Sequence, residues 1–283
     1  MTTFGIQQLQ LGSILRNESS AEHALQDLSA SGFRYIELDG FMIHKTPWIA
    51  RALLSLSGMG IKHSQSLDWK GLLNKSSLHP ISIHEDLKTL EENFDLVQED
   101  IATYGPKYIV LTGLYQFPYD DEEEIGQLIV RLNRLGRKLK SEGVSFLYHN
   151  HSAEFQRVSP DFTAFEMLLQ GLNPDWVNFE FDSYWALDAG ADPLQWMEKL
   201  GNRLKLYHIC DRGCRKKGPY VTPILKADAI ELGKGSMNIV SYAKKAISLG
   251  VDAIILEQHR NYAGKDPITS ARVSAEWLKE NLT

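Results

Sequence analysis

Two short apolar segments of the sequence each carry, near their carboxyl end, a side chain that can bind a metal ion. Residues 177–182 end on Asp182, and residues 204–208 end on His208. Between them, residues 191–200 have the spacing of a short amphipathic helix. A strand, a helix and a second strand in this order form the usual connection between neighbouring parallel strands. The pattern therefore predicts a carboxylate and an imidazole at the same end of two neighbouring strands.

Further polar side chains follow two other segments that we expect to be strands, residues 144–148 and residues 253–256. These side chains are His149, His151, Glu154 and Glu257. Buried charges without partners are costly, so a barrel without a function has little reason to collect acids and imidazoles at its strand ends. Acids and imidazoles without a cysteine favour a divalent ion such as Mn²⁺, Mg²⁺, Co²⁺ or Zn²⁺. We therefore predict a metal site that includes Asp182, His208 and Glu257.

The donor that residues 144–148 contribute to this site is open between two side chains. Glu154 is the only acid close behind the segment, but it lies several residues beyond the expected end of the strand. His149 and His151 would point to one side if the strand continued. Either imidazole could bind the ion, or act as a general base whose neutral form is available near pH 7.

Apolar segments rich in β-branched and aromatic residues recur along the chain and predict eight strands. They are residues 4–10, 33–38, 60–65, 107–112, 144–148, 177–182, 204–208 and 253–256. Helical spacing separates most of them, at residues 20–31, 83–104, 120–143, 191–200 and 269–281. This alternation predicts an α/β fold, a (β/α)8 TIM barrel in a single domain over residues 1–283, with the active site at the carboxyl ends of the strands. An open doubly wound sheet is the alternative, but Gly5 and Gly12 do not make its phosphate loop.

The composition excludes several classes of protein. The chain has 283 residues, of which 43% are hydrophobic and 23% charged, as in a globular protein with a large core. Its net charge of -6 disfavours a nucleic-acid-binding surface, which needs clustered Lys and Arg. The two cysteines, Cys210 and Cys214, form no disulfide framework. Without a signal peptide or a membrane-spanning apolar stretch, the sequence is expected to give a cytoplasmic, soluble protein.

Five motifs follow one another in a fixed order along the chain. They read Leu-Tyr-His-Asn-His-Ser-Ala-Glu-Phe at residues 147–155, Phe-Asp-Ser-Tyr-Trp at 181–185, Leu-Tyr-His-Ile-Cys-Asp at 206–211, Glu-Leu-Gly-Lys-Gly at 231–235 and Ile-Leu-Glu at 255–257. This series resembles that of the sugar phosphate isomerase/epimerase family, which belongs with the xylose isomerase-like TIM barrels. The resemblance covers essentially the whole chain and implies this fold and a metal site.

The resemblance also implies which residues hold the divalent ion, namely Glu154, Asp182, His208 and Glu257. The chain departs from the family at two places. Members often have a histidine at the end of the third strand, where this chain reads His-Ser-Gln-Ser at residues 63–66, and many have a Lys-Asp pair where it has Cys210 and Asp211. Both departures leave the substrate of this chain open, but not its fold.

The relatives share the removal of a proton from the carbon next to a carbonyl, which leaves an enediolate that a divalent ion stabilises. The resemblance therefore implies a metal-dependent isomerase or epimerase acting on a sugar or a related polyol or keto compound. A lyase of the same superfamily, working by inosose-type dehydration or by elimination from a 3-keto-glycoside, is the alternative. An abasic-site endonuclease is disfavoured by the net negative charge, because such an enzyme needs a basic face for DNA. A non-catalytic sugar-binding barrel is disfavoured because all four implied metal ligands are present. The expected acid–base groups are Glu154, Glu257, His149 and His151.

Three residues are expected to contact the substrate, a small sugar-like molecule. Trp185 could stack on a sugar ring, while Asp211 and Arg212 lead into a basic loop, residues 212–223, that could clamp a phosphate or carboxylate. Residues 66–80 are long enough to form a lid. We expect neither a nucleic acid nor a membrane as partner, and the sequence leaves a homo-oligomer open.

Overall fold

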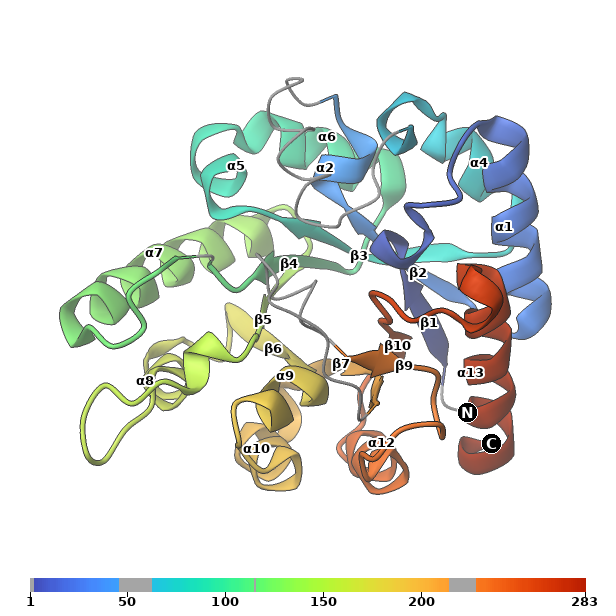
Figure 1. The fold of residues 1–283 in the computed structure, drawn as a ribbon. Helices are drawn as coiled ribbons and strands as arrows, with labels where there is room; N and C mark the ends of the chain where they lie inside the picture. The colour runs from blue at the N-terminus through green and yellow to red at the C-terminus, as the bar shows by residue number, and fades with distance from the viewer. Residues whose placement is uncertain (1–2, 46–62, 115, 214–227) are drawn as a thin grey trace. The chain divides into compact units, whose positions relative to one another are not determined.

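The computed structural model describes residues 3–45, 63–114, 116–213 and 228–283. Eight parallel strands alternate with helices along the chain, and their order, β1-β10-β7-β6-β5-β4-β3-β2, is that of a closed barrel (Figure 1). Their bounds are Phe4–Gln7 (β1), Tyr35–Asp39 (β2), His79–Glu85 (β3), Tyr108–Thr112 (β4), Ser145–His149 (β5), Val177–Asp182 (β6), Leu204–Ile209 (β7) and Ala253–Leu256 (β10). The expected (β/α)8 architecture is confirmed. A two-stranded antiparallel pair, β8 (Asp211–Arg212) and β9 (Ala229–Ile230), is separate from the barrel.

The helices follow the strands in the order expected of a β/α repeat. Their bounds are Glu18–Ser31 (α1), Gly40–Ile43 (α2), Trp69–Lys75 (α4), Leu87–Glu92 (α5), Phe94–Tyr104 (α6), Glu122–Ser141 (α7), Ala164–Gly171 (α8), Ser183–Asp188 (α9), Pro193–Leu200 (α10), Ile239–Ser248 (α12) and Pro267–Leu282 (α13). Among the described residues, none of these helices is long and apolar enough to cross a membrane.

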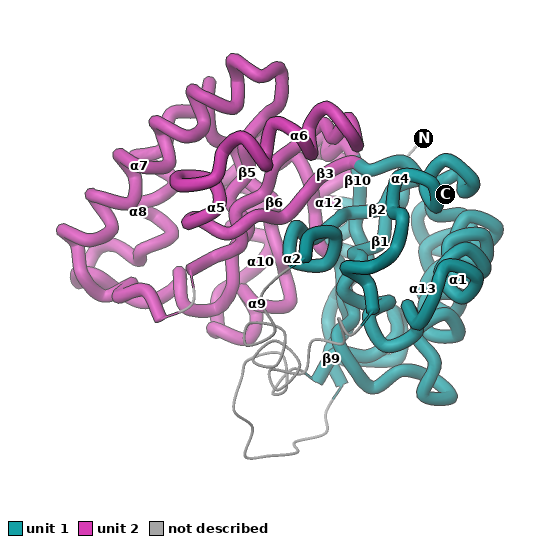
Figure 2. The backbone as a smooth tube through the Cα atoms, turned by 90° about the horizontal axis from the view of Figure 1, so that it is seen from above, with its two compact units in different colours: residues 1–80, 209–244, 253–283 teal, residues 81–208, 245–252 magenta. Residues whose placement is uncertain are grey.

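The contacts divide the chain into two compact units (Figure 2). Unit 1 contains residues 1–80, 209–244 and 253–283, and in it β1 pairs with both β2 and β10. Unit 2 contains residues 81–208 and 245–252, and in it β4 to β7 pair in sequence order next to β3.

The strand register in unit 2 decides which polar side chains meet. His149 of β5 lies opposite Glu180 of β6, and Asp182 of β6 lies opposite His208 of β7. The register shifts between Phe179 and Glu180, where β6 has an irregularity. Because opposite residues on neighbouring strands are the closest across a sheet, the backbone brings these two pairs together.

Helix α7 illustrates how the local sequence sets an element. Five of its apolar residues repeat every three or four positions and are buried, namely Ile125, Leu128, Leu132, Leu135 and Leu139, whereas Val130 on the opposite side is exposed. The Asp121 side chain accepts hydrogen bonds from the backbone N–H groups of Glu123 and Glu124, and three acids fill the first turn. Negative charge there suits the positive end of the helix dipole. The acidic stretch is thus a helix start, as expected.

The third strand was placed wrongly by the sequence pattern. Residues 60–62 lie outside the described residues, and residues 63–65 form a turn and the start of a 3-10 helix rather than a strand. The strand is β3, and the helix expected from residue 83 begins only at Leu87 and breaks at Asn93. In β3, apolar and polar residues alternate, yet residues 81–85 are all buried. This alternation is the pattern of a strand, but the expected helix extends back over it from the helical residues that follow, Leu87–Glu92 and Phe94–Tyr104.

The segment suggested as a lid, residues 66–80, contains helix α4. The Trp69 side chain on this helix is 1% exposed, and its ring N–H donates to the carbonyl of Ser64 at 2.9 Å. Trp69 therefore packs into unit 1 like a core residue.

Two glycines of α7 allow a direct test of this packing. A Cβ atom at Gly136 would lie 2.7 Å from the carbonyl oxygen of Trp176 and 2.8 Å from Val177 Cγ2, whereas a Cβ at Gly126 would meet nothing within 4 Å. We expect Gly136→Ala to destabilise the protein by about 1–3 kcal/mol, because backbone blocks the added methyl. Gly126→Ala should stabilise it by up to about 1 kcal/mol through helix propensity. Urea unfolding measures both. An equal midpoint for the two variants would contradict this packing.

Candidate metal centre

Unit 2 collects imidazoles and carboxylates at the carboxyl ends of two of its strands and one residue before the ends of two others. All five side chains are at most 6% exposed: His84 on β3, His149 on β5, Glu180 and Asp182 on β6, and His208 on β7. Residues 180 and 182 are two positions apart on one strand, so their side chains point to the same face. The strands thus deliver the five groups to one buried region of this unit.

The Glu180 carboxylate is the centre of the cluster. Its Oε2 atom lies 2.9 Å from His149 Nδ1, 3.1 Å from His84 Nε2 and 3.3 Å from His208 Nε2. Burial favours the neutral acid, but the imidazoles of His208 and His84, with the hydrogen bond from His149, hold the pKa of the Glu180 carboxyl well below its usual range. The Glu180 carboxylate is therefore surrounded by three imidazole rings.

Asp182 lies beside His208 and caps the next helix. Its Oδ1 accepts a hydrogen bond from the backbone N–H of Trp185 at 3.0 Å, and its Oδ2 is 3.8 Å from His208 Nδ1. Asn150 fixes the backbone at this point, because its amide donates to the carbonyl of Asp182 at 3.1 Å and accepts from the N–H of Asp182 at 3.0 Å. The middle residue of the His-Asn-His motif thus holds the ends of β5 and β6 together.

Three of these residues fit a divalent ion. One ligand-type atom from each of His149, Asp182 and His208 lies within 4.8 Å of the other two. Metal bonds of about 2.0–2.2 Å place ligand atoms about 3–4 Å apart, so small side-chain movements suffice to close this set around an ion. Two nitrogens and one oxygen, without sulfur, suit Zn²⁺, Co²⁺ and Mn²⁺.

Glu154 occupies a different environment in unit 2. One carboxylate oxygen accepts hydrogen bonds from the hydroxyls of Tyr148 at 3.0 Å and Tyr119 at 3.2 Å, and the other accepts from the backbone N–H of His151 at 3.0 Å. Complete burial raises the pKa of the Glu154 carboxyl to about 7, although these donors oppose the rise. The His151 ring packs on Trp185, with ring centroids 5.4 Å apart. Glu154 is thus an acid whose proton is exchangeable near neutral pH.

In unit 1, Glu257 follows the end of β10 and is 8% exposed. Its Oε2 lies 3.6 Å from Nε2 of His259. The residue therefore lies at a strand end, as the sequence indicates.

Asp211 holds a loop of unit 1 together. It is 1% exposed, and its carboxylate accepts four backbone hydrogen bonds, from the N–H groups of Arg212, Gly233, Gly235 and Met237. These bonds fold the Glu-Leu-Gly-Lys-Gly segment against β8. The Arg212 side chain is half-buried, and residues 214–227 of the expected basic loop lie outside the described residues.

The structure thus brings His149, Asp182 and His208 together, and it places Glu154 with two tyrosines instead. Glu180 and His84 are members of the cluster that the sequence reasoning missed. The signal for Glu180 was its position two residues before Asp182, on the same face of the strand. His84 was hidden because its segment was interpreted as the start of a helix.

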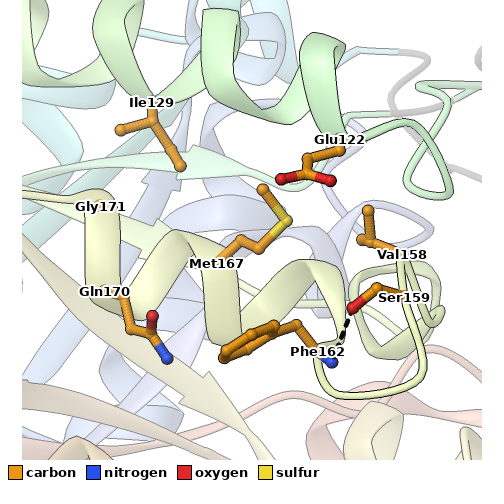
Figure 3. Close-up of a pocket in the computed structure, with 8 residues that line it drawn as sticks. All are labelled: Glu122, Ile129, Val158, Ser159, Phe162, Met167, Gln170 and Gly171. Carbon is orange, nitrogen blue, oxygen red and sulfur yellow. Dashed lines mark hydrogen bonds between the residues drawn. The ribbon is translucent and has the colours of Figure 1, made fainter.

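A cavity of about 370 Å³ in unit 2 lies apart from these groups (Figure 3). It is bounded by α7, α8 and the segment around residue 160, and its lining consists of Glu122, Ile129, Val158, Ser159, Phe162, Met167, Gln170 and Gly171. The lining offers one carboxylate and no imidazole. None of the histidines and acids of the candidate metal centre therefore lines this cavity.

Comparison with known proteins agrees with the fold. A family model described as a xylose isomerase-like TIM barrel matches residues 25–281. An inosose dehydratase of Bacillus velezensis is 20% identical over 280 residues, which cover 93% of this chain and 90% of that protein. A sugar phosphate isomerase/epimerase structure from Parabacteroides distasonis is 24% identical with a TM-score of 0.76, and the match covers 98% of this chain and 93% of that one. The IolI protein, solved with a bound zinc atom, is 17% identical with a TM-score of 0.69 over the full length of both chains.

The raised pKa of Glu154 predicts a pH-dependent stability. The folded state binds this proton more tightly than the unfolded state, so the stabilisation is complete below the usual carboxyl pKa and is lost as the pH rises through about 7. In metal-free protein, wild type should gain about 3 kcal/mol over Glu154→Gln between pH 8 and pH 4. Urea unfolding across this range measures the difference. A difference that does not change with pH would show that the carboxyl titrates in its ordinary range.

Proposed function

The chain belongs to the family of xylose isomerase-like TIM barrels, and on that premise we propose that it is a divalent-metal-dependent enzyme acting on a sugar or a related polyol or keto compound. The observation that carries the proposal is the approach of His149, Asp182 and His208, from three consecutive strands, to within 4.8 Å of one another. A barrel that needed only a packed core would fill such strand ends with apolar side chains.

In this proposal Asp182 and His208 hold the ion, with Glu257 as a further ligand from the end of β10. The segment after β5 supplies the fourth donor, for which His149 and Glu154 are the two side chains. The geometry of unit 2 favours His149, and the family resemblance favours Glu154. The zinc atom of the IolI protein supports a divalent ion in this fold. Mn²⁺, Mg²⁺, Co²⁺ and Zn²⁺ are the ions that the donor set suits.

The reaction begins with the removal of a proton from the carbon next to a carbonyl. The bound ion would supply positive charge for the enediolate that this step leaves. Glu154 suits the proton transfer, because a carboxyl with a pKa of about 7 both accepts and releases a proton near neutral pH. Glu257, His149 and His151 are the other groups that could carry the proton at this site.

The fate of the proton decides the class of enzyme. Return to the same or the neighbouring carbon gives an epimerase or isomerase, and loss of a β-hydroxyl gives a dehydratase. The similarity to inosose dehydratases favours the dehydratase as the second candidate. Incubation of cyclic and open-chain keto-polyols with the enzyme in D₂O separates the two, because only the dehydratase forms an unsaturated product.

Substrate contacts are proposed for two of the three expected residues. Trp185 is buried beside His151, where its ring could border a sugar. Arg212 lies at the start of the loop that would reach a charged group. The Asp211 carboxylate already accepts four backbone hydrogen bonds, so its role is to shape this loop.

Metal analysis of purified variants tests the site. We expect about one divalent ion per wild-type chain, and its loss in Asp182→Ala and in His208→Ala, because each variant removes a ligand. Glu91→Gln is the control, since Glu91 pairs with Arg131 on the surface of the same unit. His149→Ala and Glu154→Gln identify the fourth donor by which of them loses the ion. Metal retained in both Asp182→Ala and His208→Ala would contradict the proposal.

Glu257→Gln tests the ligand from unit 1. The amide keeps the size of the side chain but loses its charge, so turnover should fall by at least about 100-fold. Steady-state kinetics with saturating Mn²⁺ measure the effect. Wild-type turnover in this variant would remove Glu257 from the site.

A further inference from the structure

We propose that Glu180 is a positioning residue that fixes the orientation and the tautomer of three imidazoles, and so decides which ring nitrogen each offers to an ion or a substrate. Neither the sequence motifs nor the comparisons assign a role to this residue. The claim about tautomers holds for the metal-free protein, and the claim about metal affinity rests on the proposed function.

The imidazole contacts of Glu180 all involve one of its two carboxylate oxygens. All three imidazole nitrogens approach the same oxygen, Oε2, at 2.9–3.3 Å, while Oε1 is a buried atom without a hydrogen-bond partner. The side chain is completely buried. An ionised carboxylate accepts hydrogen bonds and donates none, so each of the three nitrogens that face it must carry a hydrogen.

This requirement sets the tautomer of His208. Its Nε2 faces Glu180 and its Nδ1 faces Asp182, at 3.3 and 3.8 Å. With the hydrogen on Nε2, the lone pair of Nδ1 points toward the Asp182 carboxylate, where the ion would bind. A ligating histidine that donates its other N–H to a carboxylate is the common arrangement in metal sites, because it fixes the ring and raises its basicity.

The same oxygen sets the opposite tautomer of His149. Here Nδ1 faces Glu180 at 2.9 Å, so the hydrogen lies on Nδ1 and the lone pair on Nε2. His84 resembles His208, because its Nε2 faces Glu180 and its Nδ1 lies 2.9 Å from the hydroxyl of Thr112, which can donate to it. The Glu180 carboxylate therefore favours a hydrogen on Nδ1 of His149 and on Nε2 of both His84 and His208.

A substitution with little change in shape is available. In Glu180→Gln, the amide can turn either its oxygen or its NH₂ group toward the three rings, because Oε1 of Glu180 has no hydrogen-bond partner that would fix one orientation. An NH₂ group donates a hydrogen bond, so the facing ring nitrogens no longer need to carry a hydrogen. The variant removes the charge that orders the three rings while the packing stays the same. Glu180→Asp keeps the charge but withdraws it by one methylene. Glu91→Gln is the control, because Glu91 is an acid of unit 2 that pairs with Arg131 on helix α7.

The first readout is the tautomer of each ring in metal-free protein. Long-range nitrogen–proton NMR correlations at pH 8, with the signals assigned by single histidine substitutions, should give Nδ1–H for His149 and Nε2–H for His84 and His208. In Glu180→Gln, the Nδ1–H preference of His149 should be lost, while Glu91→Gln keeps it. An Nε2–H ring at His149 in wild type, or the same pattern in Glu180→Gln, would overturn the proposal.

The second readout is the affinity for Zn²⁺, measured by competition with a chelating dye. Glu180→Gln should bind the ion about 10- to 100-fold more weakly than wild type, with Glu180→Asp in between and Glu91→Gln unchanged. If Glu180→Gln does not fold, Glu180→Asp is judged by the same criteria. Wild-type affinity in the Glu180 variants overturns the positioning role. A wild type that shows the tautomer pattern but binds no ion supports the hydrogen-bond assignment and overturns the metal proposal instead.

Discussion

The hydrogen-bonded ion cluster around Glu180 is the constraint on which the candidate site depends. A carboxylate with no exposed surface is costly unless donors surround it, and here the donors are three imidazoles on three different strands. The strand register provides them, because it sets His149 opposite Glu180 and Asp182 opposite His208. A slip of one residue along any of these strands would turn the groups away from one another. The contacts of Glu180 and the strand register of unit 2 therefore favour the same alignment of the strands.

The fold follows from the sequence where a strand is a continuous apolar run. Residues 108–112 and 253–256 are runs of this kind, and each forms a strand as expected. Strand β3 is different, since Pro80, Ser82 and His84 interrupt its apolar residues. Its polar side chains become buried only when other strands provide partners such as Thr112, and no local pattern contains that information. The alternation of apolar and polar residues in β3 is typical of a strand with one exposed face, so it does not predict that both faces are buried.

The site could be predicted in part for a related reason. Asp182 and His208 end apolar segments, and the rule that barrel sites lie at the carboxyl ends of strands finds them. The partners of Glu154 could not be found in this way, because Tyr119 lies 35 positions earlier in the chain and meets Glu154 only in the folded unit. The same holds for Asp211, which is expected at the substrate but shapes a loop through four backbone bonds. The local sequence shows where a residue lies on a strand. It does not show which distant residues will contact a buried acid after folding.

We propose that Asp182 and His208 bind one divalent ion together. Anomalous X-ray diffraction at the zinc edge, from crystals of the zinc-loaded protein, tests it most directly, because the signal locates the ion without reference to activity. We expect a peak about 2.1 Å from an Asp182 carboxylate oxygen and about 2.1 Å from His208 Nδ1. A zinc-loaded crystal whose anomalous peaks lie only at other residues, or which has no peak, would contradict it.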